Sequence, residues 1–139
     1  MEVFVVPNNI TASLFFSEGV ENMQQGFNQR LSIVNPFVTM VTPFIPTALT
    51  FNVNVVLSGV VKHEKYHISL QLVHLETKEV AFLQEFDDFM IPEQMENLNM
   101  NFDMKNVPFR HDGIYEATFK IDEHVTHGQM ILKLANTQV

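Results

Sequence analysis

Alternation of apolar and polar residues is the feature of this sequence that most restricts its fold. In the segment Leu49–Leu57, every second residue from Leu49 onward is apolar, and Thr or Asn occupies most positions between them. Side chains along a β-strand point alternately to its two faces, so this pattern predicts a strand with one buried and one hydrated face. The same pattern predicts four more strands, over residues 66–73, 97–104, 115–122 and 130–134.

Three other apolar segments alternate less regularly, at Glu2–Val6, Ala12–Phe16 and Leu31–Met40. We expect edge, bent or more fully buried strands there. Proline has no backbone N–H for a sheet ladder, so the Asn35–Pro36 bend and the Thr42–Pro46 stretch are expected at a sheet edge or corner.

Helix is expected to be scarce, because only Glu18–Arg30 and Pro92–Asn97 lack a strand pattern and could be helical. Gly19 and Gly26 together would cost a helix about 2 kcal/mol relative to alanine. We therefore predict a loop over Glu18–Arg30, with at most one helical turn, and little more than a turn over Pro92–Asn97.

About eight strands with almost no helix are typical of an all-β fold. Short turns are expected at Glu76–Glu79 and Asp122–His124, between neighbouring strands. No linker or internal repeat divides the 139 residues. The sequence therefore predicts one domain over residues 1–139, a single antiparallel β-sandwich of seven to nine strands, immunoglobulin-like or a similar Greek key.

One short motif favours the immunoglobulin-like alternative. His111–Ala117 resembles the Asp-x-Gly-x-Tyr-x-Cys entry to the sixth strand of immunoglobulin domains, where the glycine makes a turn and the tyrosine hydroxyl bonds back to the backbone. Here Gly113 directly follows Asp112, and Ala117 stands in place of the cysteine. The resemblance implies a tyrosine corner at Tyr115 without the disulfide.

A longer resemblance covers the segment from about Phe51 to Leu134. This part of the chain is similar to small β-sandwich proteins of unknown function from Gram-positive bacteria and their phages. The resemblance implies a fold but no activity. The residues that carry it, some of them upstream of that segment, are Asn35-Pro36, Pro43–Pro46, His67, Asn99–Asn106, Gly113-x-Tyr115 and the Asp122 turn.

Composition excludes several classes of site. Without cysteine the chain has no disulfide framework, no Cys-ligated zinc, no iron–sulfur cluster and no thiol catalysis. Neither a Gly-x-Ser-x-Gly nucleophile motif nor a glycine-rich phosphate loop is present. We therefore expect a protein that is not an enzyme and has no cofactor. The start, Met1–Pro7, lacks a basic region and a long apolar run, so we expect a cytoplasmic protein without membrane contact.

Charge is distributed unevenly and bears on the choice of partner. The net charge is -8, and residues 1–61 hold only four charged side chains. An acidic chain repels phosphate, so direct nucleic-acid binding is not expected. The neutral first half favours self-association as a homo-oligomer, whereas the acidic second half favours a basic protein partner. In one hypothesis the protein is an acidic inhibitor that mimics nucleic acid, with charge from Glu76, Glu79, Glu85, Asp87, Asp88, Glu93 and Glu96.

Two histidine pairs are the candidates for a metal site. His63 and His67 are four residues apart, and His124 and His127 flank the turn that contains Asp122 and Glu123. Four residues of extended strand span about 13 Å, which is too far for both rings to reach one ion, whereas a hairpin turn between His63 and His67 would close the gap. We therefore assign no metal ligands, and a metal-dependent binding protein is the third hypothesis for function.

The apolar residues Phe86, Phe89, Met90, Ile91 and Met95 lie in a predicted connection, where apolar side chains need another reason to occur. They either cap one end of the sandwich or form an exposed anchor patch for a partner chain. The preferred hypothesis is accordingly a non-enzymatic protein-binding or assembly module with a phage-related or accessory role. Loops 17–30 and 84–97 or an exposed strand edge would make the contact.

Overall fold

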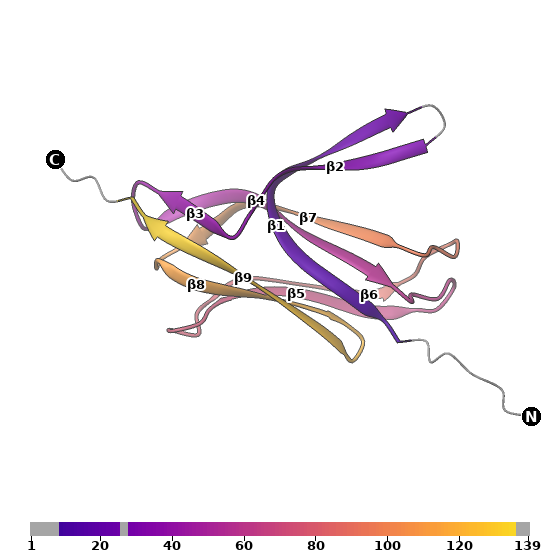
Figure 1. Ribbon diagram of the computed structural model, residues 1–139. Coiled ribbons are helices and arrows are strands. Elements are labelled where there is room, and N and C mark those ends of the chain that lie inside the picture. Colours follow the sequence, from indigo (N-terminus) through magenta and orange to yellow (C-terminus); the bar gives the residue numbers. More distant parts are fainter. Residues whose placement is uncertain (1–8, 26–27, 136–139) are drawn as a thin grey trace, which may run out of the picture.

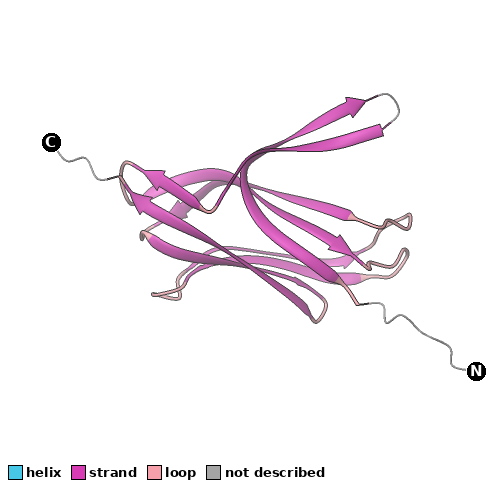
Figure 2. Cartoon of the chain, in the orientation of Figure 1, coloured by secondary structure: helices cyan, strands magenta, loops and turns pink. Residues whose placement is uncertain are grey.

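The alternating segments form nine strands in a computed structural model, which describes residues 9–25 and 28–135. Within these residues there is no helix, and so none that is long and apolar enough to cross a membrane (Figure 2). The predicted strand at Glu2–Val6 lies outside the described residues. The strands are β1 (Thr11–Gln25), β2 (Asn28–Phe37), β3 (Thr39–Thr42), β4 (Thr47–Ser58), β5 (Tyr66–His74), β6 (Val80–Phe89), β7 (Leu98–Phe109), β8 (Gly113–Ile121) and β9 (His124–Leu134).

The strands form two facing sheets (Figure 1). One has the order β2-β1-β4-β7 and the other the order β3-β9-β8-β5-β6. The neighbours β9-β8-β5-β6 opposite β1-β4-β7 give the arrangement of an immunoglobulin-like sandwich, as the sequence predicts. Pro36 lies on the edge strand β2, and the Thr42–Pro46 stretch is the corner between β3 in one sheet and β4 in the other.

The prediction of a wholly antiparallel sandwich is wrong for one pair of strands. β3 pairs with β9 in parallel, with Thr39 opposite Ile131. The reason is that the chain leaves β2 at Phe37 and enters β3 at Thr39 after a single residue, Val38. It therefore changes sheets without reversing its direction.

The core lies between the sheets and is built from the apolar positions of the alternating segments. On β4, Phe51, Val53, Val55 and Leu57 are all buried. Facing them, the buried apolar side chains of the other sheet are Tyr66, Ile68, Leu70, Leu72, Tyr115, Ala117, Phe119, Ile121, Met130 and Leu132.

The outer face of β4 differs from the expectation of a hydrated surface. Asn52 and Asn54 are buried, Asn54 with 1% of its surface exposed. The Asn54 amide nitrogen donates to the hydroxyl of Ser17 at 2.8 Å, and Asn101 donates to the Asn54 amide oxygen at 2.7 Å. The Asn54 amide can be buried because side chains on the two neighbouring strands form its hydrogen bonds. The alternation of apolar and polar residues in the sequence does not reveal these partners.

The predicted loop over Glu18–Arg30 is wrong. β1 continues to Gln25 and pairs with β2, which begins at Asn28. Residues 18–25 and 28–35 form a two-stranded antiparallel ribbon, which we call the arm, and Figure 1 shows it extending away from the two sheets. The two glycines disfavoured a helix but did not exclude cross-strand pairing.

The connection predicted at residues 84–97 is also partly wrong, because β6 extends to Phe89. The pairing of β5 with β6 shifts register twice, between Tyr66 and Ile68 and between Leu72 and Val73. Asp88 has a positive φ of 57°. These irregularities interrupt the alternation of apolar and polar residues along β6, so its sequence does not predict a strand.

The Gly113–Tyr115 motif begins β8, and its tyrosine contacts the backbone just before that strand. Gly113 has a φ of 115°, and the Tyr115 hydroxyl donates to the carbonyl oxygen of His111 at 2.5 Å. That these residues form the tyrosine corner of immunoglobulin domains stays a prediction.

Candidate partner-binding groove

An open groove runs along one side of the sandwich, between the edge strands β6 and β7. Its cavity has a volume of about 390 Å³. β5 and β6 line it from one sheet and β7 from the other. The lining residues are Ile68, Phe86, Asp87, Phe89, Met100, Asn101 and Phe102.

Apolar side chains make up most of the groove. Ile68 is fully buried at its base, while Phe86 is 40% exposed. Phe89, Met100 and Phe102 are half-buried and pack against the core, and the Phe102 ring lies 6.0 Å from that of Phe119. The groove is thus an extension of the core that reaches the surface.

One charged side chain lines the groove. The Asp87 carboxylate lies 2.6 Å from Nδ1 of His67, which comes from the neighbouring strand β5. Glu85 and Asp88 are also exposed on β6. The rim formed by β6 is therefore acidic.

Both strands beside the groove end their sheets. Among the described strands, β6 is bonded to β5 alone and β7 to β4 alone. The free edge of such a strand carries backbone N–H and C=O groups that another strand can pair with. An extended chain lying in the groove would meet an apolar surface and two such edges.

The structure separates the five residues predicted to contact a partner. Phe86 and Phe89 line the groove, whereas Ile91 is 3% exposed and belongs to the core. Met90 and Met95 are exposed, at 45% and 39%, and lie outside the groove lining. Ile91 is thus buried as an end cap would be, and the other four residues are at least partly open to solvent. Contact of these residues with a partner stays a prediction.

Three apolar lining residues were not predicted to belong to a site. The alternation places Met100 and Phe102 in the core, together with Met104, and Ile68 follows the same pattern on β5. Met104 is indeed buried, but Met100 and Phe102 are only half-buried because their strand ends the sheet. Sequence periodicity gives the face of a strand but not its distance from an edge.

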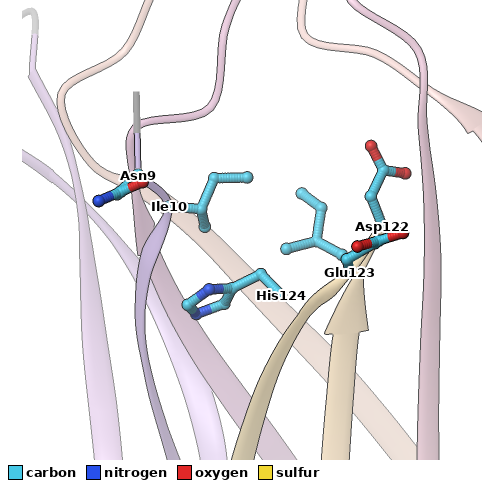
Figure 3. Close-up of a pocket in the computed structure, with 6 residues that line it drawn as sticks. Asn9, Ile10, Asp122, Glu123 and His124 are labelled. Carbon is cyan, nitrogen blue, oxygen red and sulfur yellow. The ribbon is translucent and has the colours of Figure 1, made fainter. Parts of the chain in front are cut away.

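The predicted histidine and carboxylate group near the β8–β9 turn does not converge. Figure 3 shows the His124 ring beside Asn9 and Ile10, apart from the Asp122 carboxylate. One Asp122 oxygen instead accepts from the backbone N–H of His67 at 2.8 Å. Over residues 9–25 and 28–135, no three His, Asp or Glu side chains are arranged to hold a metal ion. The metal hypothesis stays a prediction without support.

Two carboxylates of the predicted acidic surface have side-chain partners. Glu79 lies 2.9 Å from Nε2 of His111 and 3.6 Å from Nε of Arg110. Asp87 is paired with His67. The positive charge of Arg110 therefore weakens the acidic field at Glu79.

One protein family matches the sequence over most of its length. The family of unknown function DUF6941 matches residues 13–132. The chain belongs to this family. The matched region of the DUF6941 chain begins within β1 and ends within β9, and so includes the arm and both edges of the groove. No curated protein matches the sequence.

Solved structures resemble this DUF6941 protein only weakly. A β-glucosidase from Listeria innocua in complex with isofagomine has a TM-score of 0.46 and 10% identity, over 91% of this chain and 17% of that one. The CARDB domain of a protein from Pyrococcus furiosus, in complex with di-metal ions, has a TM-score of 0.42 and 10% identity, over 89% and 96% of the two chains. The chain thus spans a small part of the glucosidase, and neither likeness indicates what the DUF6941 protein binds.

Proposed function

We propose that this DUF6941 protein is a non-enzymatic protein-binding module that holds an extended segment of a partner chain in the groove between β6 and β7. The observation that carries the proposal is an open groove lined by Phe86, Phe89, Met100 and Phe102, at the free edges of two strands. A role as a phage-related or accessory protein stays a prediction.

The free edge of β6 favours an extended partner over a helical one. A peptide that adds a strand to a sheet gains affinity from backbone hydrogen bonds and specificity from pockets that accept alternate side chains. Leu83 is 56% exposed on β6 and offers further apolar contact along the same strand.

Charge and lining together define the chemistry of the partner. Half-exposed aromatic rings bind apolar or aromatic side chains. The carboxylates of Glu85, Asp87 and Asp88 on β6 attract lysine or arginine, as does the net charge of -8. The expected ligand is therefore a segment with alternate apolar side chains flanked by basic residues.

A peptide titration tests this function. The probe is a fluorescent peptide of about ten residues that alternates valine with lysine around one central phenylalanine, a length typical of a long strand. We expect measurable binding by fluorescence anisotropy, and Phe86→Ala should weaken it at least about tenfold, which corresponds to 1.4 kcal/mol. Phe44→Ala is the matched control, since Phe44 is 65% exposed and lies outside the groove lining.

The outcomes separate this function from the alternatives. No binding at millimolar peptide, or equal loss of affinity in Phe86→Ala and Phe44→Ala, would contradict the proposed function. The acidic-inhibitor hypothesis predicts instead that Phe86→Ala has no effect and that affinity falls steeply between low and moderate salt, because screening removes the charge attraction.

A further inference from the structure

A second hollow lies between the arm and the outer face of the four-stranded sheet, with a volume of about 370 Å³. Its floor comes from β1, β4 and β7, and its wall comes from the β2 half of the arm. The residues that matter most to it are Phe15, Leu31, Ile33, Asn54, Val56 and Asn101. We call it the arm groove.

The arm carries apolar side chains that the sandwich does not cover. Leu31 is 41% exposed and Met23 is 47% exposed. Met23 lies opposite Arg30 and Leu31 opposite Asn22, so the two exposed side chains belong to opposite faces of the ribbon. A two-stranded ribbon on its own is marginally stable in water, so the arm is stabilised by any surface that covers it.

The floor of the arm groove is rich in amides. Asn54 is satisfied within the fold by Ser17 and Asn101, while Asn99 and Asn101 are exposed on β7. An amide presents both a donor and an acceptor, so an amide surface can form hydrogen bonds with a copy of itself. A surface of carboxylates cannot, because it offers only acceptors and like charges.

Charge also selects this face for contact between two copies. Residues 1–61 contain only Glu2, Glu18, Glu21 and Arg30, and the other twenty charged residues lie in residues 62–139. Two chains of net charge -8 repel each other least where both are nearly neutral. Arg30 lines the arm groove and supplies a positive charge for a carboxylate of the other arm.

We propose that the arm and its groove bind a second copy of this chain. The arm of each copy packs on the outer face of the other, so that the same residues contact each other twice around a two-fold axis. The apolar side chains Met23 and Leu31 become covered, and the amides of β7 gain partners. This interface is separate from the groove between β6 and β7.

Mass measurement of the full chain tests the proposal. Light scattering from micromolar to near-millimolar protein should show a concentration-dependent species of twice the 16.0 kDa chain mass. A monomer at every concentration overturns the proposal. The result does not depend on the peptide titration, so this inference and the proposed function can fail separately.

Substitutions locate the interface. Leu31→Ser removes an apolar contact from the interface. Arg30→Glu adds charge repulsion and leaves the apolar contacts in place. Each substitution should raise the dimer dissociation constant at least about tenfold. Arg30→Glu keeps the test valid if Leu31→Ser disturbs the arm itself. Leu83→Ser is the matched control, since Leu83 is exposed on β6 in the other sheet. A dimer weakened by Leu83→Ser but not by the arm variants overturns the proposal.

A cross-link gives an independent measurement, since the chain contains no cysteine. Met23→Cys places one thiol on the arm, and Leu83→Cys places one on β6. Under mild oxidation we expect disulfide-linked dimers to accumulate faster for Met23→Cys. Equal rates for the two variants overturn the placement of the interface on the arm.

Discussion

Nε2 of His74 lies 2.8 Å from the backbone carbonyl oxygen of Asp112, where β5 ends and β8 is about to begin. The other ring nitrogen, Nδ1, accepts the backbone N–H of Thr77 at 3.2 Å. Nε2 therefore carries the hydrogen and donates it to Asp112. The His74 side chain is 3% exposed and its ring lies 4.8 Å from that of Tyr115. One buried imidazole thus joins two turns to the core.

Replacing this imidazole should destabilise the fold. His74→Leu leaves the Asp112 carbonyl and the Thr77 N–H without their partner, and we expect a loss of about 2–3 kcal/mol in the free energy of unfolding. Urea denaturation measures it. His124→Leu is the control and should change stability by less than about 0.5 kcal/mol, because His124 is only half-buried at the start of β9. Equal effects of the two substitutions would contradict a joining role for His74.

Stability should fall at alkaline pH through Tyr115. Burial raises the pKa of the Tyr115 hydroxyl above its ordinary value of 10.0. The folded protein then retains a proton that the unfolded chain releases, so this contribution is complete below pH 10 and is lost as the pH rises through the raised pKa. Burial raises the pKa of Tyr66 as well, so both residues act in the same direction.

Tyr115→Phe separates the two contributions. At neutral pH we expect a loss of about 1 kcal/mol, because the His111 carbonyl loses its donor. Above pH 10 the variant should lose stability less steeply than the original chain, with Tyr66 responsible for the remainder. Denaturation curves at several pH values measure both effects, and parallel pH profiles for the two proteins would show that Tyr115 does not titrate with unfolding.

Two glycines should respond to alanine with opposite signs. Gly59 has a φ of 93°, and a Cβ there would lie 2.6 Å from the backbone oxygen of Asn9. Gly59→Ala should therefore cost more than about 1 kcal/mol. Around Gly19 a Cβ would meet only the Val34 Cβ at 4.0 Å, so Gly19→Ala should raise stability by about 0.4–1 kcal/mol. Thermal melts of both variants test the pair, and a stable Gly59→Ala protein would count against the described approach of Asn9.

The buried amide of Asn54 should matter more than its exposed neighbour on the same sheet face. Asn54→Leu removes the donor to Ser17 and the acceptor of Asn101, and the expected cost is about 1–2 kcal/mol. Asn99→Leu, at an exposed position of β7, should change stability by less than about 0.5 kcal/mol. Chemical denaturation of the two variants gives the comparison, and a neutral Asn54→Leu would show that the amide network contributes little.

Periodicity predicted the central strands because each of them buries one complete face. β4, β5 and β8 have neighbours on both sides and lie over the core, so their apolar positions repeat every second residue. The arm and β6 lie at edges. The arm has no face buried by the core, and a register shift in β6 puts Phe86 and Phe89 on the same face although they are three residues apart. Their sequences therefore lack the signal.

The candidate groove was predictable only in part, for the same physical reason. Phe86 and Phe89 stood out because they occurred where no strand was expected. Met100 and Phe102 alternate as regularly as core residues do, and only the position of β7 at the end of its sheet leaves them half-open. Which strand ends a sheet depends on contacts between distant segments, and a local pattern does not contain them.

β1 is one uninterrupted strand that belongs to the sandwich through residues 11–17 and to the arm beyond them. Tension applied to the arm along this strand therefore reaches the β1–β4 ladder as shear, in which the seven paired positions from Thr11 to Ser17 resist together. A force at right angles to the strand would instead open the same ladder one bond at a time. A molecule bound to the arm is therefore anchored to the two sheets with a strength that depends more on the direction of the force than on the number of hydrogen bonds.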